Sequence, residues 1–187
     1  MSYAPGMGEL LLFSIPSLIY LAVLGRRSRL GAAEARKRQG LMVGEAPGYG
    51  WTLVLALPLL ALSWLAVELI PSDLENAPGV VIAQVSGIAA VIGVVGRALG
   101  EEILFRGLIG GVLIRRLDFW VGNTAQAVVF LLPHALLLAV DPRIWPILPV
   151  QFLAGWLLGW LRHRSGFVLP GALVHAAVNL LVGVLVA

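Results

Sequence analysis

The sequence lacks cysteine altogether and carries little charge. With no cysteine among 187 residues, a disulfide, a thiolate nucleophile and a cysteine-ligated metal are all excluded. Charged residues make up 12% of the chain and hydrophobic residues 59%, whereas about one quarter of a soluble domain is charged. A membrane protein is therefore expected. Its net charge of +3 then concerns topology rather than nucleic acid, which is not an expected partner.

Six apolar runs follow one another along the chain. A helix needs about 20 such residues to cross a lipid bilayer. The runs occupy residues 9–25, 51–70, 80–114, 119–140, 147–161 and 167–187. The third run is too long for one straight crossing, so it predicts either a tilted helix interrupted by glycines or two shorter helices. Together the runs predict an all-α, polytopic transmembrane bundle of about six spans with no β-sheet.

Basic residues gather in alternate loops. Loop 26–40 contains six of them, and the turns near residues 115 and 163 contain two each. The positive-inside rule puts these loops in the cytoplasm. Loop 26–40 is expected to be solvated, and the chain is expected to divide into an amino-terminal transmembrane hairpin, 1–79, and a core, 80–187.

Several polar side chains fall inside the apolar runs, where a charge costs at least about 2.5–3.5 kcal/mol. At 1.5 Å per residue, Glu101 lies roughly 21 Å and His134 roughly 22 Å from the ends of their helices. His175 lies roughly 16 Å from its own helix end. Three separate segments therefore bring a carboxylate and two imidazoles to a similar depth. Lesser polar candidates, expected mainly to pack between helices, are Gln84, Asn123, Gln126 and Gln151. For Arg97 two alternatives stay open, which are snorkelling to the interface and pairing with a motif glutamate.

Spacing within each run is also ordered. Glu102 and Arg106 are four residues apart, so they share a helix face and are expected to pair. Glu101 points about 100° away from them and is expected to be free for other work. Two further pairs have the same spacing on other helices: Phe130 with His134, and His175 with Asn179.

These residue types suit hydrolysis of an amide bond. A carboxylate and a neutral imidazole can hold a water molecule and remove its proton. A second imidazole and an amide can donate hydrogen bonds to a developing oxyanion. The same buried acid and imidazoles could also serve as the proton relay of a transporter, which remains an alternative.

Three short motifs carry these residues in order on separate apolar runs. They are "EEILFR" (101–106), "FLLPH" (130–134) and "HAAVN" (175–179). The ordered set resembles the CPBP family of CAAX-protease and bacteriocin-processing intramembrane endopeptidases, also called Abi, and within it CAAX prenyl protease 2-like proteins. The resemblance covers residues 80–187, while residues 1–79 carry no motif.

The resemblance implies a role for each motif residue. Glu101 would activate water with His134 as its partner, and His175 and Asn179 would hold the oxyanion. Glu102 and Arg106 would form a supporting pair, and Phe130 would form part of the substrate pocket. This glutamate mechanism needs no cofactor. The alternative is a zinc ion held by Glu101, His134 and His175.

The expected function is therefore that of an intramembrane endopeptidase. Its partners would be the lipid bilayer and a membrane-anchored or lipidated protein or peptide as substrate. The resemblance places it in a prokaryotic plasma membrane as a multi-pass protein. A catalytically silent scaffold or immunity protein of the same fold is the other alternative.

Overall fold

The computed structural model describes residues 5–27, 31–75 and 86–185. Gln84 and the domain boundary expected at residue 79 lie outside these ranges, so that boundary stays a prediction. The described residues are helical and contain no strand. In chain order the elements are α1 (Pro5–Arg27), α2 (Gly31–Gln39), α3 (Ala46–Glu68), η1 (Ser72–Leu74), α4 (Ile88–Glu101), η2 (Glu102–Gly110), α5 (Gly111–Leu117), α6 (Phe119–Ala135), η3 (Leu136–Ala139), η4 (Pro142–Ile144), α7 (Ile147–Ser165) and α8 (Leu169–Leu185).

The predicted helical membrane bundle is confirmed. Each of the six apolar runs forms a helix over most of its described residues. Three helices are long and apolar enough to cross a membrane, and a fourth apolar helix is shorter: Gly6–Arg26, Ala46–Glu68 and Phe119–Ala139, then Leu169–Leu185. Large aliphatic side chains point outward, among them Leu57, which is 75% exposed. Such an apolar exterior fits a bilayer as the surrounding solvent.

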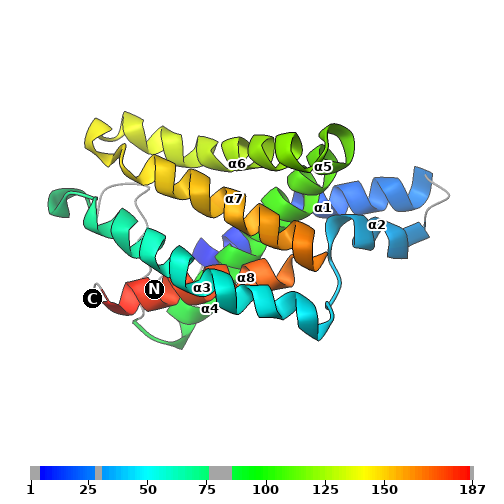
Figure 1. Ribbon diagram of the computed structural model, residues 1–187, viewed down its shortest axis with the longest axis horizontal. Helices are drawn as coiled ribbons and strands as arrows, with labels where there is room; N and C mark the ends of the chain where they lie inside the picture. Colours follow the sequence, from blue (N-terminus) through cyan, green and yellow to red (C-terminus); the bar gives the residue numbers. More distant parts are fainter. Residues whose placement is uncertain (1–4, 28–30, 76–85, 186–187) are drawn as a thin grey trace.

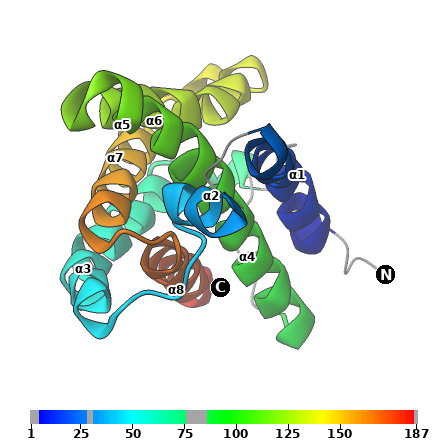
Figure 2. The same ribbon diagram turned by 90° about the vertical axis from the view of Figure 1, so that its right-hand side faces the viewer.

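The bundle is arranged around α4 and α8, which pack against each other (Figure 1). On its other side α4 packs against α1, while α3 packs against α7 and α8. Figure 2 shows α1 and α3 on opposite outer sides of the molecule. The two long helices expected as an amino-terminal hairpin are thus spread apart, because α2 carries the chain across one end of the bundle.

The third apolar run forms one continuous helix from Ile88 to Leu117 within the described residues. Its middle, η2, is a π-helix of nine residues. π-helical turns are rare and occur mostly at functional sites. The run is therefore widened in its middle rather than broken, and η2 includes the motif residues Glu102 and Arg106.

The stretch 31–39, expected as part of a solvated loop, is instead the helix α2. Gln39 at its end is fully buried, and its amide donates to a backbone carbonyl of α1 at 3.2 Å. Arg115 and Arg162 donate to the carbonyl of Arg38 at 2.8 Å and 3.4 Å. The expected loop is therefore a short helix, whose last carbonyls accept from basic side chains. Its Arg36 and Lys37 are exposed, as expected of a solvated segment.

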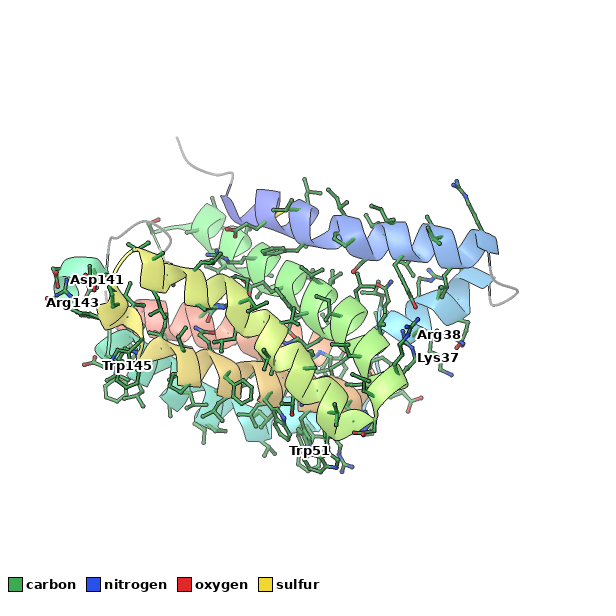
Figure 3. All side chains as sticks on the ribbon, turned by 90° about the horizontal axis from the view of Figure 1, so that it is seen from above. Lys37, Arg38, Trp51, Asp141, Arg143 and Trp145 are labelled. Atoms are coloured by element: carbon green, nitrogen blue, oxygen red, sulfur yellow. The ribbon has the colours of Figure 1, made fainter. Side chains whose placement is uncertain are left out.

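The two ends of the bundle differ in charge (Figure 3). Lys37 and Arg38 lie at one end, where Arg115 and Arg162 join them. At the other end Arg143 pairs with Asp73 and Asp141, each at 2.8 Å. Hydrogen bonds from Arg143 lower the pKa of both carboxyls below the usual value. The separation agrees with alternating loops, while the assignment of the basic end to the cytoplasm stays a prediction.

A core of aliphatic side chains fixes α8, which carries two of the motif residues. Its members come from α3, α7 and α8: Leu55, Leu59, Leu158, Leu161, Val174, Val178 and Val182. Val174 and Val178 are buried and each directly precedes a motif residue on α8, His175 or Asn179. Burial of one face of α8 therefore directs its polar motif toward α4 and η2, against which α8 also packs.

Candidate active site

A fully buried ion pair forms the centre of the site. Glu102 Oε1 lies 2.9 Å from Arg106 Nη1, and neither side chain has exposed surface. The pairing expected from the four-residue spacing is therefore confirmed. Gly171 of α8 lies against the other carboxylate oxygen, Oε2, because a Cβ at that position would come within 2.9 Å of it. The absence of a side chain at Gly171 lets α8 approach the ion pair closely.

His175 connects the two adjacent glutamates. Its Nδ1 is 3.1 Å from Glu102 Oε1, within hydrogen-bond range. Its Nε2 faces Glu101 Oε2 at 3.9 Å, which is too long for a direct hydrogen bond. An ionised carboxylate only accepts hydrogen bonds, so Nδ1 is the donor to Glu102. Nε2 is thereby directed at the Glu101 carboxylate. This contact agrees with the similar membrane depth expected for the two residues.

Glu101 is not the free carboxylate that its helical position led us to expect. Its Oε1 lies 3.4 Å from Arg97 Nε, one turn earlier on α4. Arg97 also holds Glu9 of α1, with 2.9 Å between Nη2 and Oε1. Oε2 of Glu101 is the oxygen directed toward His175. One carboxylate oxygen of Glu101 is therefore held by an arginine, and the other faces an imidazole.

His134 comes to the same region on α6. Its Nδ1 is 3.0 Å from the carbonyl oxygen of Phe130, and since a carbonyl can only accept, Nδ1 carries the proton. This leaves Nε2 as an acceptor when the ring is neutral. The ring of Phe130, which contacts the guanidinium of Arg106, lies 4.9 Å from the imidazole of His134 between centroids. His134 is thus linked to the buried ion pair through Phe130, and its direct approach to Glu101 and His175 stays a prediction.

Phe130 packs between the charged centre and His134. Its ring lies under the guanidinium of Arg106, with Cζ 4.1 Å from the ring centroid. Its centroid is 4.9 Å from that of His134 and 5.1 Å from that of Phe105. Phe130 is 2% exposed. It therefore supports two motif residues from within the core, and its role in a substrate pocket stays a prediction.

Asn179 lies one turn beyond His175 on α8 and is half-buried. The spacing puts its amide on the same helix face as His175. Two other polar residues of the apolar runs, Asn123 and Gln126, donate to α7 backbone carbonyls at 3.0 Å and 3.2 Å. The latter two join helices α6 and α7, as expected of packing residues.

Among residues 5–27, 31–75 and 86–185, no group of three or more histidine, aspartate or glutamate side chains is placed to hold a metal. The Nδ1 atoms of His134 and His175 contact Phe130 and Glu102, and a histidine held in this way binds metal through Nε2. The zinc alternative with Glu101, His134 and His175 stays a prediction, and no chemical step is assigned to a metal.

A surface hollow of about 420 Å³ lies at the basic end of the bundle, away from these residues. Its lining includes Glu45, Trp51 and Arg164. None of the seven motif residues lines it. The hollow and the carboxylate site are therefore separate features.

Sequence reasoning missed Glu9. The residue stands at the start of the first apolar run, and a charge in such a run is costly enough to require a partner. That partner, Arg97, is far away in the sequence and shares no motif with Glu9. A carboxylate in an apolar run was visible in the sequence. Only the packing of α1 on α4 shows that its partner is Arg97.

Comparison with known proteins supports the motif assignment. The family model described as "Rce1-like: Type II CAAX prenyl endopeptidase Rce1-like" matches residues 83–181, a range that includes all seven motif residues. Comparisons with curated proteins and with solved structures gave no match. The match and the apolar helices identify an integral membrane protein and, at the family level, a CAAX-type intramembrane protease with a membrane-associated protein as substrate. Since the match covers more than half of the chain, this protein belongs to the Rce1-like family of type II CAAX prenyl endopeptidases.

Proposed function

We propose that the protein cleaves a peptide bond of a membrane-anchored or lipidated protein with a water molecule activated by Glu101. The observation that carries this proposal is the arrangement of Glu101 and His175. Oε2 and Nε2 face each other at 3.9 Å, a separation at which a water molecule can contact both. Both side chains keep some exposure, 13% and 15%, while Glu102 and Arg106 have none.

In the proposed reaction, Glu101 removes a proton from water as its oxygen attacks the scissile carbonyl carbon. The neutral imidazole of His134 has an accepting Nε2, since its Nδ1 donates to Phe130. It therefore suits a second contact to the same water. The carbonyl oxygen becomes an oxyanion, and the carbon–nitrogen bond breaks as the proton passes from Glu101 to the leaving nitrogen.

His175 and Asn179 would stabilise the oxyanion. The linked residues Glu9, Arg97, Glu101, Glu102 and Arg106 contain three carboxylates and two guanidiniums, so they carry one excess negative charge. In the proposed reaction, Nε2 of His175 would donate a hydrogen bond to the oxyanion and offset this negative charge. Glu102 holds the other ring nitrogen at 3.1 Å, as a carboxylate orients histidine in hydrolytic triads.

The test compares wild type with Glu101→Gln, both reconstituted in liposomes with solubilised host membrane proteins. Mass spectrometry would measure new protein N-termini. We expect termini that appear with wild type and whose rate of formation falls by about 10²–10⁴ in the variant. Glu34→Gln is the matched control, because Glu34 pairs with Arg38 at 3.1 Å on α2 and is remote from the motif residues.

Two outcomes would reject this proposal. Equal formation of the new termini by wild type and Glu101→Gln would show that the carboxylate is not the base. Absence of any wild-type product would favour a silent scaffold or immunity protein, and proton flux without cleavage would favour a transporter. A chelator added to active wild type separates the mechanisms: the glutamate mechanism predicts unchanged cleavage, and the zinc alternative predicts its loss.

A further inference from the structure

Helix α1 lies outside the segment that matches the family, yet its residue Glu9 is linked to the site. Residues 83–181 match the family, whereas Glu9 belongs to α1. Its carboxylate reaches Arg97 Nη2 at 2.9 Å, and the Nε atom of the same guanidinium lies 3.4 Å from Glu101 Oε1. The chain Glu9–Arg97–Glu101 thus links the first helix to the proposed base.

The approach of α1 to α4 is unusually close and depends on small residues. A Cβ at Gly6 would overlap the backbone of Gly93. A Cβ at Gly100 would come within 2.9 Å of the Cα of Leu10. Small residues at such positions let two helix backbones meet in a membrane. Gly100 directly precedes Glu101, so this contact holds α1 beside the base.

Most of the apolar surface of α1 faces outward, although Ser17 is buried and donates to the carbonyl of Ile103 at 3.3 Å. Only 6% of its most apolar window is buried, and residues such as Leu11 and Leu12 are more than 60% exposed. A helix that merely filled the membrane would have no need for a carboxylate, which is costly there. The polar contact and the glycine contact coincide at the same turn of α4. This coincidence indicates a role for Glu9 beyond helix packing.

We infer that Arg97, itself fixed by Glu9, is a positioning residue for Glu101. Arg97 holds Oε1 and so leaves Oε2 directed at His175. Glu9 takes the shorter of the two contacts, so it limits how far the guanidinium can move toward Glu101. Without Glu9, Arg97 can close fully on Glu101 or turn away, and in both cases the geometry of Oε2 is no longer defined. This inference rests on the proposed function of Glu101.

The first test measures cleavage in the liposome assay. Arg97→Gln is expected to lower the rate by about 10- to 100-fold, because misplacement of a catalytic group by about 1 Å has effects of this size. Glu9→Gln is expected to lower it about threefold to tenfold, since Arg97 itself remains. Glu34→Gln again serves as control. An unchanged rate in Arg97→Gln would overturn the inference.

A charge exchange separates positioning from helix packing. The double variant Glu9→Arg/Arg97→Glu keeps an ion pair between α1 and α4 but puts a carboxylate four residues before Glu101, where like charges repel. We expect its thermal unfolding in detergent to return close to wild type, while cleavage stays as low as in Arg97→Gln. Recovery of both properties would mean that the pair only joins the helices.

A labelling experiment makes the inference independent of turnover. Dicyclohexylcarbodiimide modifies carboxyl groups in membranes, and in wild type Arg97 engages Oε1 of Glu101 at 3.4 Å. Loss of this contact frees the carboxyl group, so mass spectrometry should show Glu101 modified at least about threefold faster in Arg97→Gln than in wild type, with buried Glu102 as internal reference. Equal labelling would overturn the inference even in an active enzyme. Faster labelling in a protein without proteolysis would reject the proposed function and keep the Arg97 contact.

Discussion

Glu101 and Glu102 are adjacent in sequence, yet each belongs to a different kind of polar environment. Glu102 lies in a closed one, where Arg106, His175 and Gly171 surround it and no side-chain surface is exposed. Glu101 lies in an open one, where Arg97 and Glu9 keep about a quarter to a third of their side-chain surface exposed. The comparison shows that two adjacent glutamates can have separate roles, one in holding the structure and one in the proposed reaction. The closed carboxylate fixes His175, and the open one remains available to water.

The closed environment should dominate stability. Replacement of Glu102 by Leu leaves the guanidinium of Arg106 buried without its counter-charge, which costs about 3–5 kcal/mol. Glu101→Leu should cost about 1 kcal/mol or less, because Arg97 keeps Glu9 and is partly exposed. Denaturant unfolding in detergent, followed by tryptophan fluorescence, gives both values.

A paired substitution sharpens this result. Glu102→Leu/Arg106→Met removes both charges, and replacement of a buried pair by apolar residues is often neutral. We expect most of the lost stability to return. Equal destabilisation by Glu101→Leu and Glu102→Leu would show that the two environments do not differ.

Aromatic support offers a second, smaller contrast. Phe130 lies against Arg106 with 4.1 Å between Cζ and the ring centroid, so Phe130→Leu should cost about 1–2 kcal/mol from the cation–π contact and packing together. Phe13 of α1 contacts Phe105 at a centroid distance of 6.4 Å without a cation. Phe13→Leu should cost about 0.5 kcal/mol. The same unfolding assay ranks the two, and a larger effect at Phe13 would contradict the comparison.

The smallest effect is expected at the surface ion pairs of Arg143, whose side chain is 54% exposed. Arg143 lowers the pKa of Asp73 and Asp141, so these carboxyls stabilise the fold above their ordinary pKa of about 3.9. That contribution disappears as the pH falls through the lowered values. Arg143→Gln should therefore lower the unfolding temperature slightly at pH 7 and not at all once both carboxyls are protonated. Added salt should reduce the difference at pH 7, and a difference that grows in acid would refute this assignment.

Much of the helical architecture was predictable from the sequence. The apolar runs locate the long helices because backbone groups in a bilayer must be satisfied within the segment. The pairing of Glu102 with Arg106 follows from their spacing alone. α2 was missed because four of its nine residues are charged and it has no apolar run, although alanine, glutamate, arginine, lysine and glutamine all favour helix. A hydropathy pattern predicts membrane spans, but it does not detect short polar helices at the ends of those spans.

The candidate site was predictable only in part. Position along the runs predicts a similar depth for Glu101, His134 and His175, and the structure places Glu101 and His175 face to face at 3.9 Å. Pairing of Arg97 with a motif glutamate was one of two alternatives open from the sequence, and the structure shows it with Glu101. The contact of Arg97 with Glu9 escaped prediction, because it arises from the packing of two helices far apart in sequence. The π-helical geometry of η2 also leaves no periodic signal, since the glycines around it permit several backbone conformations.

The polar centre of the molecule joins the first and the last of the described helices. Glu9 comes from α1, whereas the imidazole that holds Glu102 comes from α8, 73 residues after that glutamate. At ribosomal rates of about 5–20 residues per second, roughly 4–15 s pass between the synthesis of Glu102 and that of His175. On the proposed mechanism, a nascent chain has its base long before its oxyanion donors. A growing polypeptide would thus remain inert toward neighbouring proteins until α8 has been inserted.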